Sequence, residues 1–284
     1  MPDSDPLAAD LFTWKLILAY DGTDFRGWQV QPGERTIQGE LQNALGRITG
    51  EIPLPQGSGR TDAGVHALAQ VASFPLRAPI PPENLQRALN RTLPESIRIL
   101  KANTEPSTFH ARHSAVAKTY EYRIRLAKPG CESICSPFLA RYVYAFPWPL
   151  DLNKLESAAQ LLLGEHDFLS FAATDPDLTA RNQSVSQGSF TDPKEKCSTI
   201  RTIFSSTWTK QAAEGGDLLV YRVRGNGFLH HMVRNLVGTM LDMGRGYRQT
   251  EAIPAIFAAH ARSAAGPTAP ARGLFLHSVE FDRA

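Results

Sequence analysis

Residues 57–67 read GSGRTDAGVHA, and this stretch combines three glycines, an arginine and a carboxylate between two apolar segments. Glycine tolerates positive φ angles and lets another backbone or a ligand approach closely. Glycines that alternate with Arg60 and Asp62 therefore favour a shaped loop that presents reactive side chains. The alternative is an ordinary turn with a solvated Arg60–Asp62 pair, because short glycine motifs also occur without a function.

Strand and helix patterns alternate on both sides of this loop. The apolar segment 14–20 predicts a buried strand, and the helical spacing from Ile37 to Ile48 predicts a helix capped by Thr36 and ended by Gly50. The following patterns predict a short strand before residue 57, a strand at 69–74, a helix from Pro81 and a strand at 97–100. This alternation predicts an α+β or α/β fold.

The second half of the chain repeats this mixture. Residues 118–126 alternate most clearly, with Tyr120 and Tyr122 on one face and Glu121 and Arg123 on the other. Further elements are expected as a helix capped by Asp151, strands at 199–208 and 218–224, a strong helix from Leu229 to Met240, a short helix at 254–261 and a strand at 274–281. The organisation along the chain is therefore expected to be a flexible N-terminus at 1–13, an N-terminal α/β domain at 14–128, a crossover at 129–150 and a C-terminal α/β domain at 151–284 with an exposed insertion at 173–198.

Length and composition describe an ordinary globular chain. Its 284 residues, 42% hydrophobic and 20% charged, suffice for one large domain or two medium ones. The absence of a run of 18 apolar residues and the acidic N-terminus predict a soluble, cytoplasmic protein. Three cysteines make no disulfide framework. Cys131 and Cys135 could share a metal with His110 and His113, but their spacing matches no common zinc pattern.

The charge distribution favours a polyanionic partner. Residues 91–128 carry a local balance of +5 and residues 222–248 one of +4, whereas residues 1–24 carry −4. Two basic segments on a chain of net charge +2 are typical of a polyanion-binding surface, although two solvated faces would give the same composition. His230 and Arg234 are one helical turn apart and could act on one surface, whereas adjacent histidines are expected to point apart, which disfavours a two-histidine metal site.

Five motifs occur along the chain in a fixed order. They are YDGTDFRGWQ at 20–29, GRTDAGVHA at 59–67, FHAR at 109–112 with KTYEY at 118–122, FLHHMVRN at 228–235, and GLFL at 273–276. Together these motifs resemble the tRNA pseudouridine synthase A family, and the resemblance covers nearly the whole chain. The chain departs from the family at Lys118, where arginine is common, and in the long insertion 173–198. We expect neither departure to touch the core motif.

The resemblance implies a fold and a reaction. The implied fold is α+β, with two ferredoxin-like α/β halves whose pseudo-symmetric mixed antiparallel sheets flank a basic cleft. The implied protein is a homodimer in which one tRNA contacts both subunits, with no membrane association. The implied reaction isomerises uridine to pseudouridine at positions 38 to 40 of the tRNA anticodon stem-loop, with no cofactor and no catalytic metal.

The resemblance also implies roles for individual residues. Asp62 matches the nucleophile, and the adjacent Arg60 would stabilise its charge and help to turn the target nucleotide out of the stem. Tyr120 matches the tyrosine that packs on the uracil and is placed to help remove the C5 proton. Arg234 looks like a second active-site arginine, although its helix could equally use it for phosphate, and substrate-binding roles are also expected for His230 and Arg26.

Two other classes of protein remain open at this point. A non-catalytic RNA-binding protein would keep the basic segments and the aromatic residues but would not need Asp62. A hydrolase with a carboxylate nucleophile usually needs a second carboxylate as its acid–base partner, and this motif contains none. Within the synthase hypothesis, the sequence leaves open whether Asp62 first attacks C6 of the base or C1′ of the ribose.

Overall fold

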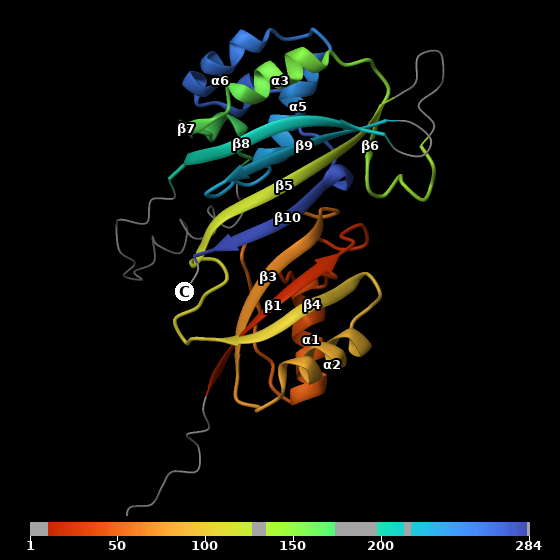
Figure 1. Ribbon diagram of the computed structural model, residues 1–284, viewed down its shortest axis with the longest axis vertical. Helices are drawn as coiled ribbons and strands as arrows, with labels where there is room; N and C mark the ends of the chain where they lie inside the picture. The colour runs from red at the N-terminus through yellow and green to blue at the C-terminus, as the bar shows by residue number, and fades with distance from the viewer. Residues whose placement is uncertain (1–10, 127–134, 174–197, 213–216, 283–284) are drawn as a thin grey trace, which may run out of the picture. The chain divides into compact units, whose positions relative to one another are not determined.

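The computed structural model describes residues 11–126, 135–173, 198–212 and 217–282 (Figure 1). The chain divides into two compact units: unit 1 contains residues 1–119 and 274–284, and unit 2 contains residues 120–273. Both units combine strands with helices, so the expected α+β class is confirmed. None of the helices among the described residues is both long and apolar enough to span a membrane.

Unit 1 is a sheet covered by two helices. Its elements are β1 (Phe12–Tyr20), α1 (Ile37–Thr49), β2 (Gln56–Gly57), β3 (His66–Leu76), α2 (Pro82–Thr92), β4 (Ile97–Glu105) and β10 (Leu274–Phe281). The strands lie in the order β4-β1-β3, and β1 is antiparallel to both neighbours. β2 pairs antiparallel with β3 at Ser73, whereas β10 pairs parallel with β3 at His66. The chain order β1-α1-β2-β3-α2-β4 with this arrangement is ferredoxin-like.

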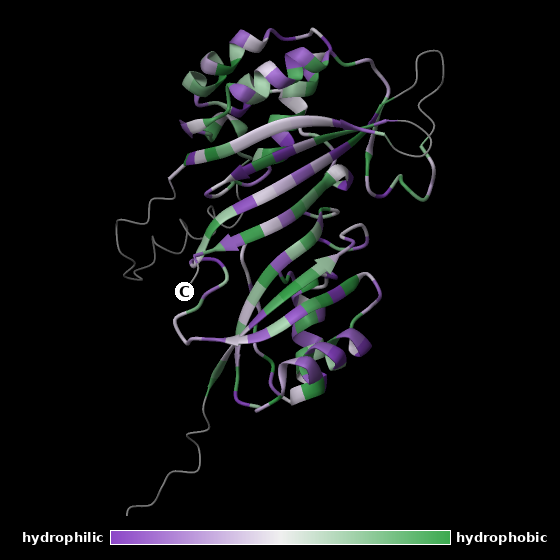
Figure 2. Ribbon diagram, viewed as in Figure 1, coloured by the Kyte–Doolittle hydropathy of each residue, from purple (hydrophilic) through white to green (hydrophobic). Residues whose placement is uncertain are grey.

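Local sequence signals explain where these elements begin and end. The Thr36 Oγ1 accepts a hydrogen bond from the Gly39 N–H at 3.2 Å, and Gly50 ends α1 with φ at +75°, which only glycine adopts readily. Along β1, alternate residues from Trp14 to Tyr20 are buried. Figure 2 shows β1 largely hydrophobic and α2 largely hydrophilic on its outer side.

Unit 2 repeats the same kinds of element. Its elements are β5 (Ala115–Leu126), which enters the unit at Tyr120, β6 (Tyr144–Phe146), α3 (Leu152–Gln160), β7 (Gly164–Asp167), β8 (Ile200–Gln211), β9 (Leu218–Gly225), α5 (Met232–Gly244), α6 (Ile253–Ala259) and the short 3₁₀ helices Leu169–Phe171, Thr250–Ala252, Arg262–Ala264 and Ala271–Gly273. The strand order is β5-β9-β8-β7, with the helices α3, α5 and α6 gathered together (Figure 1). Apart from the short strands β6 and β7 and the 3₁₀ helix Leu169–Phe171, the chain order β5-α3-β8-β9-α5 matches β1-α1-β2-β3-α2 of unit 1.

The units differ from the expected domain bounds in four places, the first being that unit 1 ends at Thr119 and not at residue 128. β10 belongs to unit 1 rather than to a C-terminal domain, because its backbone pairs with β3. The expected crossover 129–150 contains β6, which pairs parallel with the end of β5. Phe12 is already part of β1 instead of a flexible terminus. Residues 1–10 and nearly all of the insertion 173–198 lie outside the described residues, so those expectations stay predictions.

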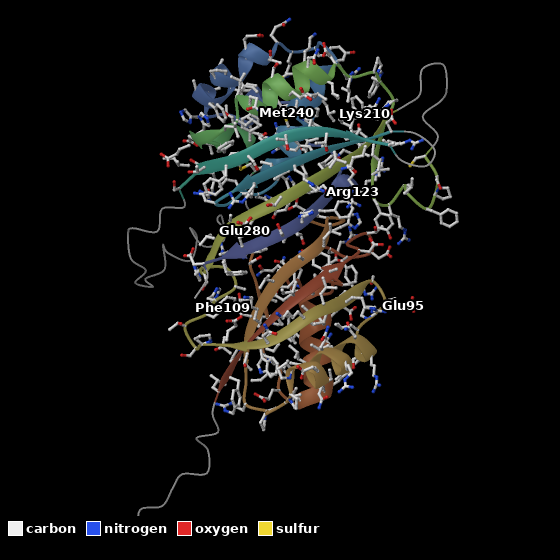
Figure 3. All side chains as sticks on the ribbon, viewed as in Figure 1. Glu95, Phe109, Arg123, Lys210, Met240 and Glu280 are labelled. Carbon is white, nitrogen blue, oxygen red and sulfur yellow. The ribbon has the colours of Figure 1, made fainter. Side chains whose placement is uncertain are left out.

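The outward face of β5 is not simply solvated, in contrast to the alternation expected there. The Glu121 side chain is only 4% exposed and accepts hydrogen bonds of 2.7 Å from Nε of Arg123, labelled in Figure 3, and from Nε of Arg222. Burial raises the pKa of the Glu121 carboxyl, but the hydrogen bonds and charges of the two arginines outweigh burial and hold the pKa below its usual range. The two arginines therefore keep a buried carboxylate ionised.

Replacing Glu121 with Gln is expected to destabilise the protein by about 1 kcal/mol at pH 7, since two arginines lose a charged acceptor while Arg222 remains half-exposed to water. A carboxyl whose pKa is lowered by folding stabilises the protein above its unfolded pKa, and this contribution disappears as the pH falls through the folded pKa. Urea denaturation should therefore show a difference in the free energy of unfolding between Glu121→Gln and the unchanged protein at pH 7, and this difference should shrink below about pH 4. A difference that stays constant with pH would contradict the ion pairing.

Candidate active site

The glycine-rich stretch connects β2 to β3 and forms a loop at the surface of unit 1. The Val65 N–H donates to the Asp62 carbonyl at 3.1 Å, and Gly64 between them adopts φ of +77°, so the backbone turns immediately after Asp62. Arg60 is exposed and Asp62 is half-buried. The loop therefore presents a cation and a carboxylate two residues apart on a constrained backbone.

A second loop, residues 21–28, packs directly against the first. The Trp28 N–H donates to the Thr61 carbonyl at 3.0 Å. Gly27 has φ of +91°, and a Cβ there would lie 2.6 Å from the same carbonyl oxygen. At Gly22, a Cβ would lie 1.9 Å from the Val65 carbonyl oxygen. These two glycines are thus required by the close approach of the protein's own backbone.

The loop 21–28 contains both aromatic and charged side chains, and these differ in their exposure. Phe25 and Trp28 are each 2% exposed, so both aromatic rings belong to the core of unit 1. Arg26 points into solvent, with its side chain 68% exposed and its Nε 3.3 Å from a carboxylate oxygen of Glu34. Arg26 is therefore placed where a large anionic ligand can reach it.

Sequence reasoning missed a buried polar cluster beneath the Arg60–Asp62 loop. It consists of Tyr20, Ser58, Thr61 and Gln70, none of which is more than 6% exposed. The signal was present in β3, where Gln70 shares a strand face with buried Ala72 and Phe74 and is the polar exception. A polar residue at a core position of a strand indicates a specific hydrogen-bond requirement.

Lys118, a departure from the family pattern, contacts the residue directly before the GRTDAGVHA motif. Its Nζ donates to the Ser58 carbonyl at 2.6 Å. The contact arises because the first residues of β5 lie in unit 1 together with the loop. A long cationic side chain at this position therefore helps to hold the start of the loop.

In unit 2, Tyr120 is 7% exposed and its ring meets the edge of the Phe228 ring, with centroids 5.0 Å apart and planes at 78°. Tyr122, two residues further along β5, is fully buried and its hydroxyl donates to the Pro270 carbonyl at 2.8 Å. The expected common face of the two tyrosines is confirmed. The Tyr122 hydroxyl is thus committed to a backbone carbonyl.

The segment before α5 differs from the expected helix. α5 begins at Met232, because His231 adopts the left-handed conformation with φ of +58° and interrupts helical geometry. The rings of His230 and His231 were expected to point apart, but their centroids lie 4.0 Å from each other. Arg234 lies in the first turn of α5, and its Nε donates to the Ala269 carbonyl at 2.8 Å.

The cluster considered for a metal is only partly described. Cys131 lies outside the described residues. The rings of His110 and His113 are 4.4 Å apart, and Nδ1 of His110 accepts a hydrogen bond from the Arg112 N–H at 3.1 Å. Burial, followed by the charges of His113 and Arg112, lowers the pKa of His110. A lowered pKa favours the neutral form of the His110 ring.

Each unit thus holds part of the predicted set. Unit 1 carries Arg26, Arg60 and Asp62, with the latter two on one loop, and unit 2 carries Tyr120, His230 and Arg234. The loop offers a carboxylate that can act as a nucleophile or a base, and unit 2 offers a phenol and two basic side chains.

Comparison with known proteins extends over both units. The profile of a family described as tRNA pseudouridine synthase matches residues 16–114 and 158–282. A protein of Solibacter usitatus named tRNA pseudouridine synthase A is 50% identical over 268 residues, which cover 94% of this chain and 98% of that relative. Proteins of the same name from Bacillus pumilus and a Geobacillus species are 41% and 40% identical, each over 94% of this chain and 98% of the relative.

Proposed function

Because the chain belongs to the tRNA pseudouridine synthase family, we propose that it isomerises uridine to pseudouridine at positions 38 to 40 of the tRNA anticodon arm. The observation that carries this proposal is a similarity that covers 98% of relatives with that name and includes both units. The alternative of a non-catalytic RNA-binding protein would leave the constrained Arg60–Asp62 loop without a use.

Asp62 is the proposed nucleophile. In the reaction the bond from C1′ to N1 breaks, the uracil turns, a bond from C1′ to C5 forms, and the C5 proton leaves while N1 takes up a proton. A carboxylate can attach to the reacting nucleoside and leave again, which keeps the base or the ribose activated between these steps. The half-buried position of Asp62 on a turn suits this role, because the carboxylate is both held and reachable.

Arg60 and Tyr120 are the proposed partners of Asp62. Arg60 is exposed and can reach the target nucleotide, so it would stabilise the carboxylate and help to turn the nucleotide out of the stem at an unstacking cost of a few kcal/mol. Tyr120 offers a ring for stacking on the uracil and a hydroxyl for acid–base work at C5.

Three basic residues are proposed to contact the tRNA backbone. Arg26 is largely exposed, His230 is half-buried, and Arg234 has its Nε fixed by the Ala269 carbonyl, which sets the direction of its guanidinium group. Phosphate oxygens are the natural ligands of such groups. We further propose that the protein works in the cytoplasm as a homodimer, with one tRNA contacting both subunits, and needs neither a cofactor nor a catalytic metal.

Incubation of unmodified tRNA transcripts with the purified protein is expected to produce carbodiimide-dependent primer-extension stops only in the anticodon arm. Pseudouridine keeps its carbodiimide adduct through mild alkaline treatment, whereas the adduct of uridine is lost, so the stops report the isomer directly. Transcripts with cytidine at positions 38 to 40 serve as the control and should give no stops. Stops in another arm would indicate a different specificity, and the absence of any stop would refute the proposed activity.

A further inference from the structure

A hydrogen-bond network beneath the Arg60–Asp62 loop is centred on Gln70. The Gln70 side chain has no exposed surface. Its Nε2 donates to the Gly59 carbonyl at 2.8 Å and to Oη of Tyr20 at 3.4 Å, while its Oε1 accepts from the Ser58 hydroxyl at 2.7 Å. The amide of Gln70 thus uses both its donors and its acceptor on groups that surround the loop.

Hydrogen bonds of the network hold the loop at the residues on both sides of Arg60. Gln70 holds Gly59, the residue before Arg60, through the carbonyl. Tyr20 holds Thr61, the residue after Arg60, because Oη of Tyr20 and Oγ1 of Thr61 share a hydrogen bond of 2.8 Å. A direct hydrogen bond between Gln70 and Tyr20 connects these two contacts with the loop. The directions in which Arg60 and Asp62 leave the backbone are therefore set from beneath the loop.

The protonation state of the network, and with it the hydrogen-bond pattern, stays constant over a wide pH range. Burial raises the pKa of Tyr20 to about 12, against smaller lowering effects of its hydrogen bonds to Thr61 and Gln70. The phenol therefore stays protonated, and an amide does not titrate. Burying polar groups costs free energy unless every group is paired, so an apolar side chain would fill this core position more simply. The polar residues provide what an apolar side chain could not, because their hydrogen bonds fix the geometry of the loop.

We propose that Gln70 is a positioning residue of the reaction, which acts with Tyr20 through the backbone to orient Arg60 and Asp62. This inference rests on the function proposed above. Neither residue has to touch the substrate. A displacement of about 1 Å at a reacting group can reduce a rate by about 100-fold, so loss of the Gln70 hydrogen bonds should lower kcat far more than it changes KM.

Gln38 provides a matched control for this proposal. It is also buried, at 3% exposure, and its Nε2 donates to a backbone carbonyl, that of Pro55, at the same distance of 2.8 Å. Its Oε1 accepts from the Val30 N–H. Gln70→Leu is expected to lower kcat by about 100-fold with KM within about threefold of the unchanged protein. Gln38→Leu, which removes an equivalent hydrogen bond elsewhere, is expected to keep kcat within about twofold at a temperature where both variants are folded.

Gln70→Glu gives a second test, with the pH dependence of kcat as its signature. An ionised carboxylate cannot donate to the Gly59 carbonyl and repels its oxygen, whereas a protonated carboxyl can donate there and still accept from Ser58. The kcat of Gln70→Glu relative to the unchanged protein should therefore rise as the pH falls. A ratio that does not change with pH, or equal losses of kcat in Gln70→Leu and Gln38→Leu, would overturn the positioning role.

Amide hydrogen exchange separates this inference from the proposed reaction. Peptides that cover residues 58–62 should exchange faster in Gln70→Leu than in Gln38→Leu, whether or not the protein makes pseudouridine. If the exchange rate of the loop amides is unchanged in Gln70→Leu, the Gln70 hydrogen bonds do not hold the loop in place. If the loop loosens but the unchanged protein fails in primer extension, the proposed function fails and the structural part of the inference stands.

Discussion

Asp62→Ala is expected to abolish release of tritium from tRNA that carries uridine labelled at C5, with kcat reduced by at least roughly 10⁴-fold. The reaction removes the C5 hydrogen only after the bond between N1 and C1′ has broken and C5 has bonded to C1′. Without a group that attaches to the nucleoside, the first bond is not broken. Binding of tRNA should stay within a few-fold of the unchanged protein, because most of the affinity for a polyanion comes from phosphate contacts.

Asp62→Asn is the control that separates charge from shape. The amide keeps the size of the side chain and leaves the turn closed by the Val65 N–H and the Asp62 carbonyl, since both groups belong to the backbone. Asp62→Asn should therefore fold as the unchanged protein does and be as inactive as Asp62→Ala. Retention of tritium release in either variant would mean that another residue is the nucleophile, and a shared loss of tRNA binding would reduce Asp62 to a structural role.

The elements that the sequence predicted well are those fixed by nearby residues. Thr36 and Gly50 mark the two ends of α1 by side-chain capping and a positive φ, both of which depend on a few neighbouring residues. β6 and β7 are short and exist because they pair with β5 and β8, which no local pattern reveals. The start of α5 was placed too early, because nothing in the local sequence marks His231 as left-handed.

The same distinction applies to the candidate site. The Arg60–Asp62 loop was predictable because its residue types and spacing are contiguous in the sequence. Its support was not, because Tyr20 and Gln70 are fifty residues apart and meet only through the pairing of β1 with β3. Lys118 was similarly undervalued, since its contact with Ser58 spans sixty residues. A contiguous motif therefore reveals the residues expected to act on the substrate. It does not reveal the supporting residues, which are distant in the sequence and hold the motif in place.

Tyr120→Phe is expected to lower kcat by roughly 10²- to 10⁴-fold and to leave tRNA binding unchanged. Phenylalanine preserves the edge contact with Phe228 and the ring proposed to stack on uracil, and removes only the hydroxyl proposed to act at C5. If proton removal becomes the slow step, deuterium at C5 should slow the variant more than it slows the unchanged protein.

Tyr122→Phe is the matched control for this prediction. It removes a hydroxyl from the same face of β5, but that hydroxyl is bonded to the Pro270 carbonyl. Its loss should reduce stability by about 1 kcal/mol, measured by urea denaturation, and leave kcat unchanged. Equal kcat values for Tyr120→Phe and the unchanged protein would assign the Tyr120 hydroxyl no chemical role and leave its ring as a packing or stacking group. Tyr120→Leu then decides between those two, because loss of stacking raises KM for tRNA whereas loss of packing against Phe228 lowers stability.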